Sequence, residues 1–230
     1  AEALAGIVRH YTQGWANGFK WDIEYWELFN EPDKHSCWRG DGEEFIKLFV
    51  TCLKRLKSEF PKLKIGGPAL AAPKKQYIAN LLEACRAEGV VPDFISWHLY
   101  SSDPREVVGQ VDEIRKLVDD CGAKKCKPII DEWHYIVSWD GVVGSSPEIL
   151  RTALSGASGH NGIDSAAFTL ATIALMHDYP IDQSYFYGHG TKGYWGWLGD
   201  DGKPNKVYHA LRIFGEIVKN YSERARCVSE

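Results

Sequence analysis

The chain has 230 residues, of which 44% are apolar and 25% are charged, and its formal net charge is -4. This composition is typical of a globular protein with a sizeable core. The slightly acidic balance argues against nucleic-acid binding, which needs a basic stripe, and no apolar run approaches the ~18 residues that cross a bilayer. Aromatic residues make up 13% of the chain, with nine Trp, which indicates a surface that stacks on flat ligands such as sugars.

Short apolar runs alternate with amphipathic segments along the whole chain, and the spacing of apolar residues assigns each segment. In chain order, the pattern predicts a helix over 3–18, a strand over 23–29, a helix over 41–60, a strand over 63–67, a helix over 74–88, a strand over 94–99, a helix over 104–120, a strand over 128–132, helices over 147–158 and 163–177, a strand over 183–187 and a helix over 204–221. The helix over 41–60 has the clearest start, because Asp41 and Glu44 fit a capping box.

Strands that alternate with helices indicate a parallel sheet with helical crossovers. The repeat of about 40 residues suits an elaborated (β/α)8 barrel, although eight such units would need about 320 residues. No linker or change of composition divides the chain. The sequence therefore predicts an α/β fold, namely a single domain over residues 1–230 that is a truncated TIM barrel with about five parallel strands.

The cysteine and histidine residues give little indication of function. The six Cys form neither a disulfide scaffold nor a CxxC motif. Cys121 and Cys126 flank a tight loop, where they either form a bridge or remain separate thiols. The His residues lack the spacing of a zinc site.

Two predicted strand ends each carry a Glu where the apolar run gives way to a loop. These are Glu31 and Glu132, and the carboxyl ends of the strands surround the active site of a parallel barrel. Period-two alternation puts Glu27, Phe29 and Glu31 on one face of the first of these strands. It likewise puts Ile130 and Glu132 on one face of the other strand.

Two carboxyl groups that face each other across a barrel mouth suit the cleavage of a glycosidic bond, with one group protonated and the other ionised. Like charges about 5 Å apart push their pKa values apart. Asn30 could hydrogen-bond the 2-hydroxyl of a sugar, a contact that strengthens in the transition state. The alternative is that both Glu residues are solvated at the surface.

The run from Trp26 to Asp33, with Asn30-Glu31-Pro32 near its end, resembles the acid/base motif on the fourth strand of clan A retaining glycoside hydrolases. Further segments in the same order resemble glycoside hydrolase family 39, the β-xylosidase and α-L-iduronidase family. These segments are residues 64–68 for the fifth strand, 92–100 for the sixth, 130–133 for the nucleophile on the seventh, and 202–210 for the closing turn and helix. The resemblance covers almost the whole chain.

This resemblance implies that Glu31 is the general acid/base, that Glu132 is the nucleophile and that Asn30 binds the 2-hydroxyl. It also places His98 and Tyr100 in the site. Further candidates for sugar binding are the rings of Trp38, Trp133 and Trp195, although structural packing is the alternative for such rings. Phe186 stands where the family carries a Trp platform.

The resemblance also implies that strands one to three of the barrel are absent, so that two strands become open edges. Glu27 would then lie inside the barrel, where a carboxylate without a partner is costly or stays protonated. Either a homo-oligomer covers the missing strands, or the chain is a fragment of a longer sequence.

The predicted function is a retaining glycoside hydrolase that cleaves β-glycosidic, xylosidase-like bonds of an oligo- or polysaccharide by double displacement, without a metal or organic cofactor. Lys34, His35 and Arg39 are candidate contacts to an acidic sugar, or else solvated. The alternative function is a non-catalytic or vestigial carbohydrate-binding barrel fragment. A metal-dependent hydrolase or an aldolase-type lyase would need a ligand cluster or a Schiff-base Lys at a strand end, and the sequence shows neither.

Overall fold

The structure is a computed structural model, and it describes residues 1–139, 159–188, 195–199 and 201–225. The chain divides into two compact units. The first unit contains residues 1–99, 109–133 and 179–185, and the second contains residues 100–108, 134–178 and 186–230. That residues 1–230 act as a single domain stays a prediction.

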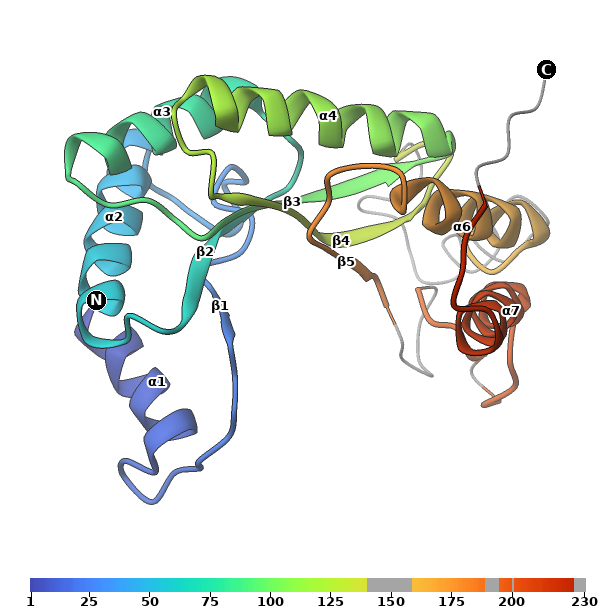
Figure 1. Cartoon of the computed structure of the whole chain (residues 1–230), viewed down its shortest axis with the longest axis horizontal. Coiled ribbons are helices and arrows are strands. Elements are labelled where there is room, and N and C mark those ends of the chain that lie inside the picture. The colour runs from blue at the N-terminus through green and yellow to red at the C-terminus, as the bar shows by residue number, and fades with distance from the viewer. Residues whose placement is uncertain (140–158, 189–194, 200, 226–230) are drawn as a thin grey trace. The chain divides into compact units, whose positions relative to one another are not determined.

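A parallel sheet forms the centre of the first unit. The strands β1 (Tyr25–Glu27), β2 (Lys64–Leu70), β3 (Phe94–Ser101), β4 (Lys127–Tyr135) and β5 (Gln183–Phe186) lie side by side in chain order, as Figure 1 shows. β1 pairs with β2 in parallel, and β2 pairs with β3 in parallel. The last residues of β3, β4 and β5 belong to the second unit.

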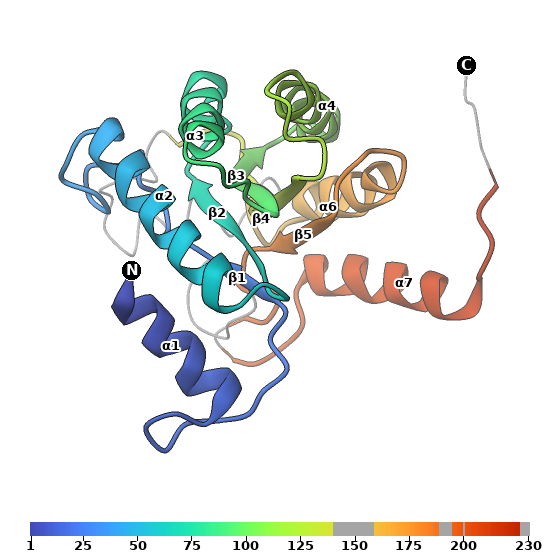
Figure 2. The same ribbon diagram turned by 60° about the vertical axis from the view of Figure 1, so that its left-hand side comes forward.

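The helices α1 (Glu2–Gln13), α2 (Gly42–Glu59), α3 (Lys75–Ala87) and α4 (Pro104–Asp120) alternate with the first four strands. In Figure 2, α2 and α3 lie on the outer side of the strands that they connect. Parallel strands that lie side by side in chain order, with the connecting helices on their outer side, have the arrangement of a TIM barrel. The predicted fold class, an incomplete barrel with five parallel strands, is therefore confirmed.

The helix α2 begins where the sequence predicts. Asp41 Oδ1 accepts a hydrogen bond from the Glu44 amide at 2.8 Å, and Glu44 Oε2 accepts one from the Asp41 amide at 3.1 Å. This capping box satisfies amide groups that lack partners within the helix. The apolar face of α2 is buried, with Phe45, Phe49 and Leu53 at its centre.

Several element boundaries differ from the prediction, and those of the first helix and the first strand have a clear backbone cause. The first helix ends at Gln13 rather than residue 18, because Gly14 takes a left-handed conformation (φ 77°) and caps it. The first strand ends at Glu27 rather than residue 29, because Phe29 and Glu31 have positive φ values of 71° and 48°. The alternation predicted for Glu27, Phe29 and Glu31 therefore does not hold beyond Glu27. The predicted helix over 147–158 lies outside the described residues.

In the second unit, α6 (Ile163–Met176) packs against α7 (Lys206–Asn220). One side of α7 leaves large apolar side chains exposed, namely Ile213, Ile217 and Val218. Among the described residues, no helix combines the length and the hydropathy needed to cross a membrane. Cys121 and Cys126 are free thiols, so of the two alternatives for this pair the separate thiols are observed.

We expect Asp41→Ala to destabilise the chain by about 1 kcal/mol, because the N-cap of α2 loses its side-chain acceptor. Urea unfolding followed by circular dichroism measures this change. Ser58→Ala, at an exposed position near the other end of α2, is the matched control and should change stability little. Equal stability of the Asp41 variant and wild type would contradict the role of the cap.

Candidate active site

The loop that follows β1 carries Glu31, and β2 holds this loop in place. The Leu28 amide donates to the Gly66 carbonyl at 2.8 Å, and the Glu31 amide donates to the Ala69 carbonyl at 2.8 Å. At Gly67 (φ 134°) a Cβ atom would lie 2.8 Å from the Leu28 carbonyl oxygen, so the close approach requires glycine. Glu31 is therefore fixed at the carboxyl end of the sheet, although it lies outside a strand.

The Glu31 carboxylate contacts two basic groups. Lys34 Nζ donates to Glu31 Oε1 at 2.7 Å, and His98 Nδ1 lies 3.1 Å from the same oxygen. The Cys37 thiol lies 3.8 Å from the other oxygen, Oε2. The Glu31 side chain is 16% exposed and the Lys34 side chain is 50% exposed, so this carboxylate is accessible from solvent.

His98 is the centre of the arrangement, because three carboxylates surround its buried imidazole. Besides Glu31, Glu132 Oε1 lies 3.6 Å from His98 Nδ1, and Asp131 Oδ2 lies 3.4 Å from His98 Nε2. The His98 side chain is only 2% exposed. The structure thus brings Glu31 and Glu132 together on one nitrogen atom, from the β1 loop and from β4.

The charges around His98 determine its protonation. Burial by itself lowers the pKa of an imidazole, since it disfavours the cation. Here the hydrogen bond to Asp131 and the negative charges of Asp131, Glu132 and Glu31 outweigh burial, and the pKa of His98 is raised above 6.5. The neighbouring carboxylates therefore favour the imidazolium form.

Glu27 lies on the same side of the sheet, beside a cavity of about 250 Å³. Tyr25, Phe94, Ile129, Asp131 and Tyr185 line this cavity with it. Desolvation first, and then the negative charge of Asp131, raise the pKa of Glu27 to about 8. Because β1 is the edge strand and the Glu27 side chain keeps access to water, water moderates the desolvation.

Strand alternation alone does not explain which side chains of β4 reach the site. Ile129 and Asp131 line the cavity, so they share a face, yet Glu132 also reaches His98. The face predicted from Ile130 and Glu132 therefore missed Asp131, which contacts the other nitrogen of the same imidazole. The only signal for Asp131 in the sequence is its position directly before Glu132.

The other predicted site residues of the first unit have different environments. Asn30 is exposed on the loop beside Glu31. Trp38 donates from Nε1 to the Asp41 carbonyl at 2.9 Å, which ties its ring to the start of α2. Trp133 is 2% exposed and belongs to the core, where its ring has little surface to offer a sugar. A sugar-stacking role for Trp133 is a prediction from the sequence alone.

The second unit contains the remaining predicted site residues. The rings of Tyr100 and Trp195 lie edge to face with centroids 5.4 Å apart, and Trp139 packs against both. Trp195 also packs against His160, with centroids 3.9 Å apart. Phe186 packs against His134, with centroids 4.5 Å apart.

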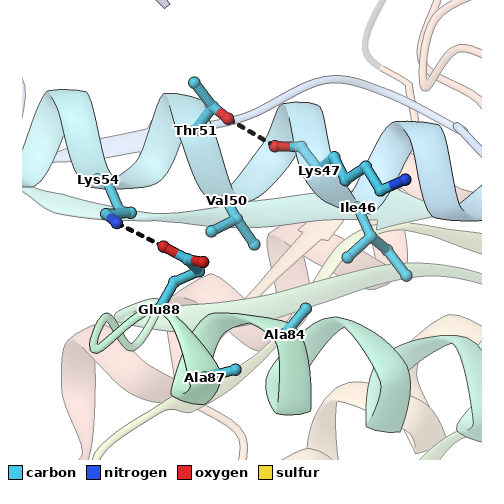
Figure 3. A pocket seen from close by; sticks show the side chains of 8 residues that line it. All are labelled: Ile46, Lys47, Val50, Thr51, Lys54, Ala84, Ala87 and Glu88. Atoms are coloured by element: carbon cyan, nitrogen blue, oxygen red, sulfur yellow. Dashed lines mark hydrogen bonds and ion pairs between the residues drawn. The ribbon is translucent and has the colours of Figure 1, made fainter.

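A larger hollow of about 480 Å³ lies elsewhere, between α2 and α3, as Figure 3 shows. Its lining includes one ion pair, between Lys54 and Glu88 at 2.6 Å, and otherwise mostly aliphatic side chains. It lacks paired carboxylates and lies on the helices rather than at the strand ends, so it is separate from the site around His98. Among the described residues, no group of His, Cys, Asp and Glu has the arrangement of a metal site.

Sequence comparison identifies the family. The sequence profile described as "Glycosyl hydrolases family 39" matches residues 2–135, which is more than half of the chain. The chain belongs to this family. Its residues are 38% identical over 105 residues to a β-xylosidase from Caldicellulosiruptor saccharolyticus and 30% identical over 104 residues to one from Geobacillus stearothermophilus.

These two matches cover 44% of this chain and 20% of each enzyme. A glucosidase from Croceicoccus marinus has a similar structure, with a TM-score of 0.76 and 26% sequence identity over 92% of this chain and 44% of the glucosidase. The family 39 chain thus spans less than half the length of the relatives that it matches. Its fold is the corresponding part of a glycosidase barrel.

We expect Glu27→Gln to stabilise the chain at pH 8. The unfolded state loses the Glu27 proton near pH 4.5, whereas the folded state keeps it up to about pH 8, so stability falls as pH rises through this window. The neutral glutamine removes this loss. After a discount for the access of Glu27 to water, we expect the substitution to raise the free energy of unfolding at pH 8 by ~1 kcal/mol. This gain would raise the midpoint of thermal unfolding by about 2–4 °C.

Thermal unfolding at pH 8 and below pH 4.5 measures this difference, which should vanish at the lower pH. The exposed Glu83→Gln on α3 is the control, and its midpoint should follow that of wild type at both values. A Glu27→Gln variant less stable than wild type at pH 8 would show that the carboxyl is ionised in the folded chain.

Proposed function

We propose that this chain carries the catalytic pair of a retaining glycoside hydrolase that cleaves β-glycosidic, xylosidase-like bonds. The supporting observation is that Glu31 Oε1 and Glu132 Oε1 lie 3.1 Å and 3.6 Å from the same His98 nitrogen. Two carboxyl groups this near each other suit the short separation of retaining enzymes, in which one group attacks the sugar directly. Membership in family 39 and the named β-xylosidases support the same substrate class.

In the proposed first step, Glu31 gives its proton to the glycosidic oxygen while Glu132 attacks the anomeric carbon. The bond between that carbon and the leaving group breaks, and a glycosyl ester of Glu132 forms. In the second step, Glu31 takes a proton from water, the water oxygen attacks the anomeric carbon, and Glu132 leaves as a carboxylate. Neither step needs a metal ion or an organic cofactor.

Lys34 Nζ lies 2.7 Å from Oε1 of Glu31, the proposed acid/base. Because half of the Lys34 side chain is exposed, a sugar that enters the site can displace its ammonium group from Glu31. We propose that Asn30 binds the 2-hydroxyl. His98, Tyr100 and the rings of Trp38 and Trp195 complete the proposed set of substrate-binding residues.

We expect Glu31→Gln to lower the turnover of an aryl β-xyloside by about 10²–10⁴-fold, because it removes general acid–base catalysis. Glu132→Gln should abolish turnover, because the amide does not form the glycosyl ester. Release of the aryl alcohol by the full chain is the measurement. Glu113→Gln, an exposed position on α4, is the matched control and should keep wild-type activity.

Azide distinguishes the two carboxylates. With Glu31→Ala, azide should restore part of the turnover and yield a β-glycosyl azide, because it attacks the glycosyl ester without help from a base. Turnover that survives both Gln substitutions would disprove the assignment. Sugar binding without any turnover in wild type would instead support the alternative, a carbohydrate-binding fragment, for which the rings of Tyr100, Trp139 and Trp195 are suited.

We also infer that copies of this chain associate. In the first unit β1 is an open strand edge, which favours pairing with another chain. In the second unit, Ile213, Ile217 and Val218 are 47%, 47% and 56% exposed. Light scattering at micromolar concentration should give a mass above that of the 25.9 kDa chain, and a clean monomer would contradict the inference.

A further inference from the structure

Four carboxyl groups and one imidazole form a connected cluster in the first unit. Glu31 and Glu132 face Nδ1 of His98, Asp131 faces Nε2, and Glu27 interacts with Asp131 beside the cavity. The groups come from the β1 loop, β3, β4 and β1. The neighbouring β2, residues 64–70, brings only apolar residues and glycine close to them, because its Lys64 lies at the far end of the strand.

Asp131 fixes the state of His98 at the nitrogen that faces away from the two candidate catalytic groups. Asp131 Oδ2 lies 3.4 Å from Nε2 and Glu31 Oε1 lies 3.1 Å from Nδ1, so each nitrogen faces a carboxylate. A carboxylate accepts a hydrogen bond only from a nitrogen that carries a proton, and when Nε2 carries the proton toward Asp131, a neutral imidazole has none left for Nδ1. The negative charge of Asp131 favours a second proton there, and Nδ1 then donates toward Glu31 or Glu132.

The position of Nδ1 between two carboxylates matches how charge moves in double displacement. Before the first step the negative charge is on Glu132 and Glu31 holds a proton. In the glycosyl ester Glu132 is neutral and Glu31 is ionised, so the same single charge has moved by a few ångströms. The Nδ1 atom lies 3.1 Å from the Glu31 oxygen and 3.6 Å from the Glu132 oxygen, so the charge of the imidazolium interacts with whichever of the two carboxylates is ionised.

We propose that Asp131 is a positioning residue that keeps His98 as an imidazolium, and that this cation follows the negative charge from Glu132 to Glu31 during the reaction. Glu27 lines the same cavity as Asp131, and its protonated form supports the charge of Asp131 without competing with it. The charge-following role rests on the function proposed for Glu31 and Glu132, whereas the control of His98 by Asp131 can be measured without turnover.

Long-range ¹H–¹⁵N spectra of the full chain, recorded across pH, measure the titration of each His, and His98→Gln assigns the His98 signals by their loss. We expect the pKa of His98 in wild type to lie above 6.5 and to fall to 6.5 or below in Asp131→Asn. Asp112→Asn, at an exposed position on α4, is the matched control and should leave the titration unchanged.

Glu27→Gln tests the second half of the proposal. If Glu27 is neutral, glutamine keeps both the charge and a donor to Asp131, so His98 should titrate as in wild type. A lower pKa of His98 in this variant would show that Glu27 is ionised and would overturn its role. This arm, and the wild-type titration itself, decide the proposal even if Asp131→Asn does not fold.

A wild-type pKa of His98 at or below 6.5, or an unchanged value in Asp131→Asn, would overturn the control by Asp131. Where the chain turns over an aryl β-xyloside, Asp131→Asn should lower kcat with little change in KM and alter the pH profile, since the residue does not touch the sugar. A chain without turnover whose His98 still responds to Asp131 would refute the proposed function and leave the control of His98 intact.

Discussion

The arrangement of the site depends on one buried imidazole, because each of its two nitrogens requires a polar partner. His98 lies at the inner side of β3 with almost no access to water. Its nitrogens contact carboxylates that the chain supplies from β4 and from the loop after β1. These carboxylates repel one another, and the shared cation makes their approach tolerable. The same group therefore stabilises the cluster and sets its protonation.

The backbone around Glu31 shows how the sheet supports this cluster. Glu31 and Phe29 have left-handed conformations that are unfavourable for residues with a side chain, at a cost of about 1–3 kcal/mol each. The hydrogen bond from the Glu31 amide to Ala69 and the glycine at position 67 compensate by holding the loop against β2. Strain of this kind is common where a side chain must point toward a reaction. The loop geometry is thus a consequence of strand pairing and not of local preference.

The pair of carboxylates at Glu31 and Glu132 lies among further ionisable groups. Lys34 and His98 both contact the Glu31 carboxyl, and Asp131 and Glu27 extend the cluster to a cavity of about 250 Å³. Proton affinity in such a cluster is a property of all its members, because each ionisation changes the others. Assigning acid and base to single residues is therefore only part of the description.

The sequence by itself determined the succession of elements, the capping box at Asp41 and the residues 31 and 132 that carry the proposed chemistry. These features depend on local spacing and on a short motif, both of which are readable along the chain. Only the tertiary structure decided that the β1 loop leaves the strand conformation, that Trp133 is buried and that Asp131 and Lys34 join the site. Those properties arise from contacts between β1, β2, β3 and β4, which are far apart in sequence, and a residue-by-residue pattern contains no record of such contacts.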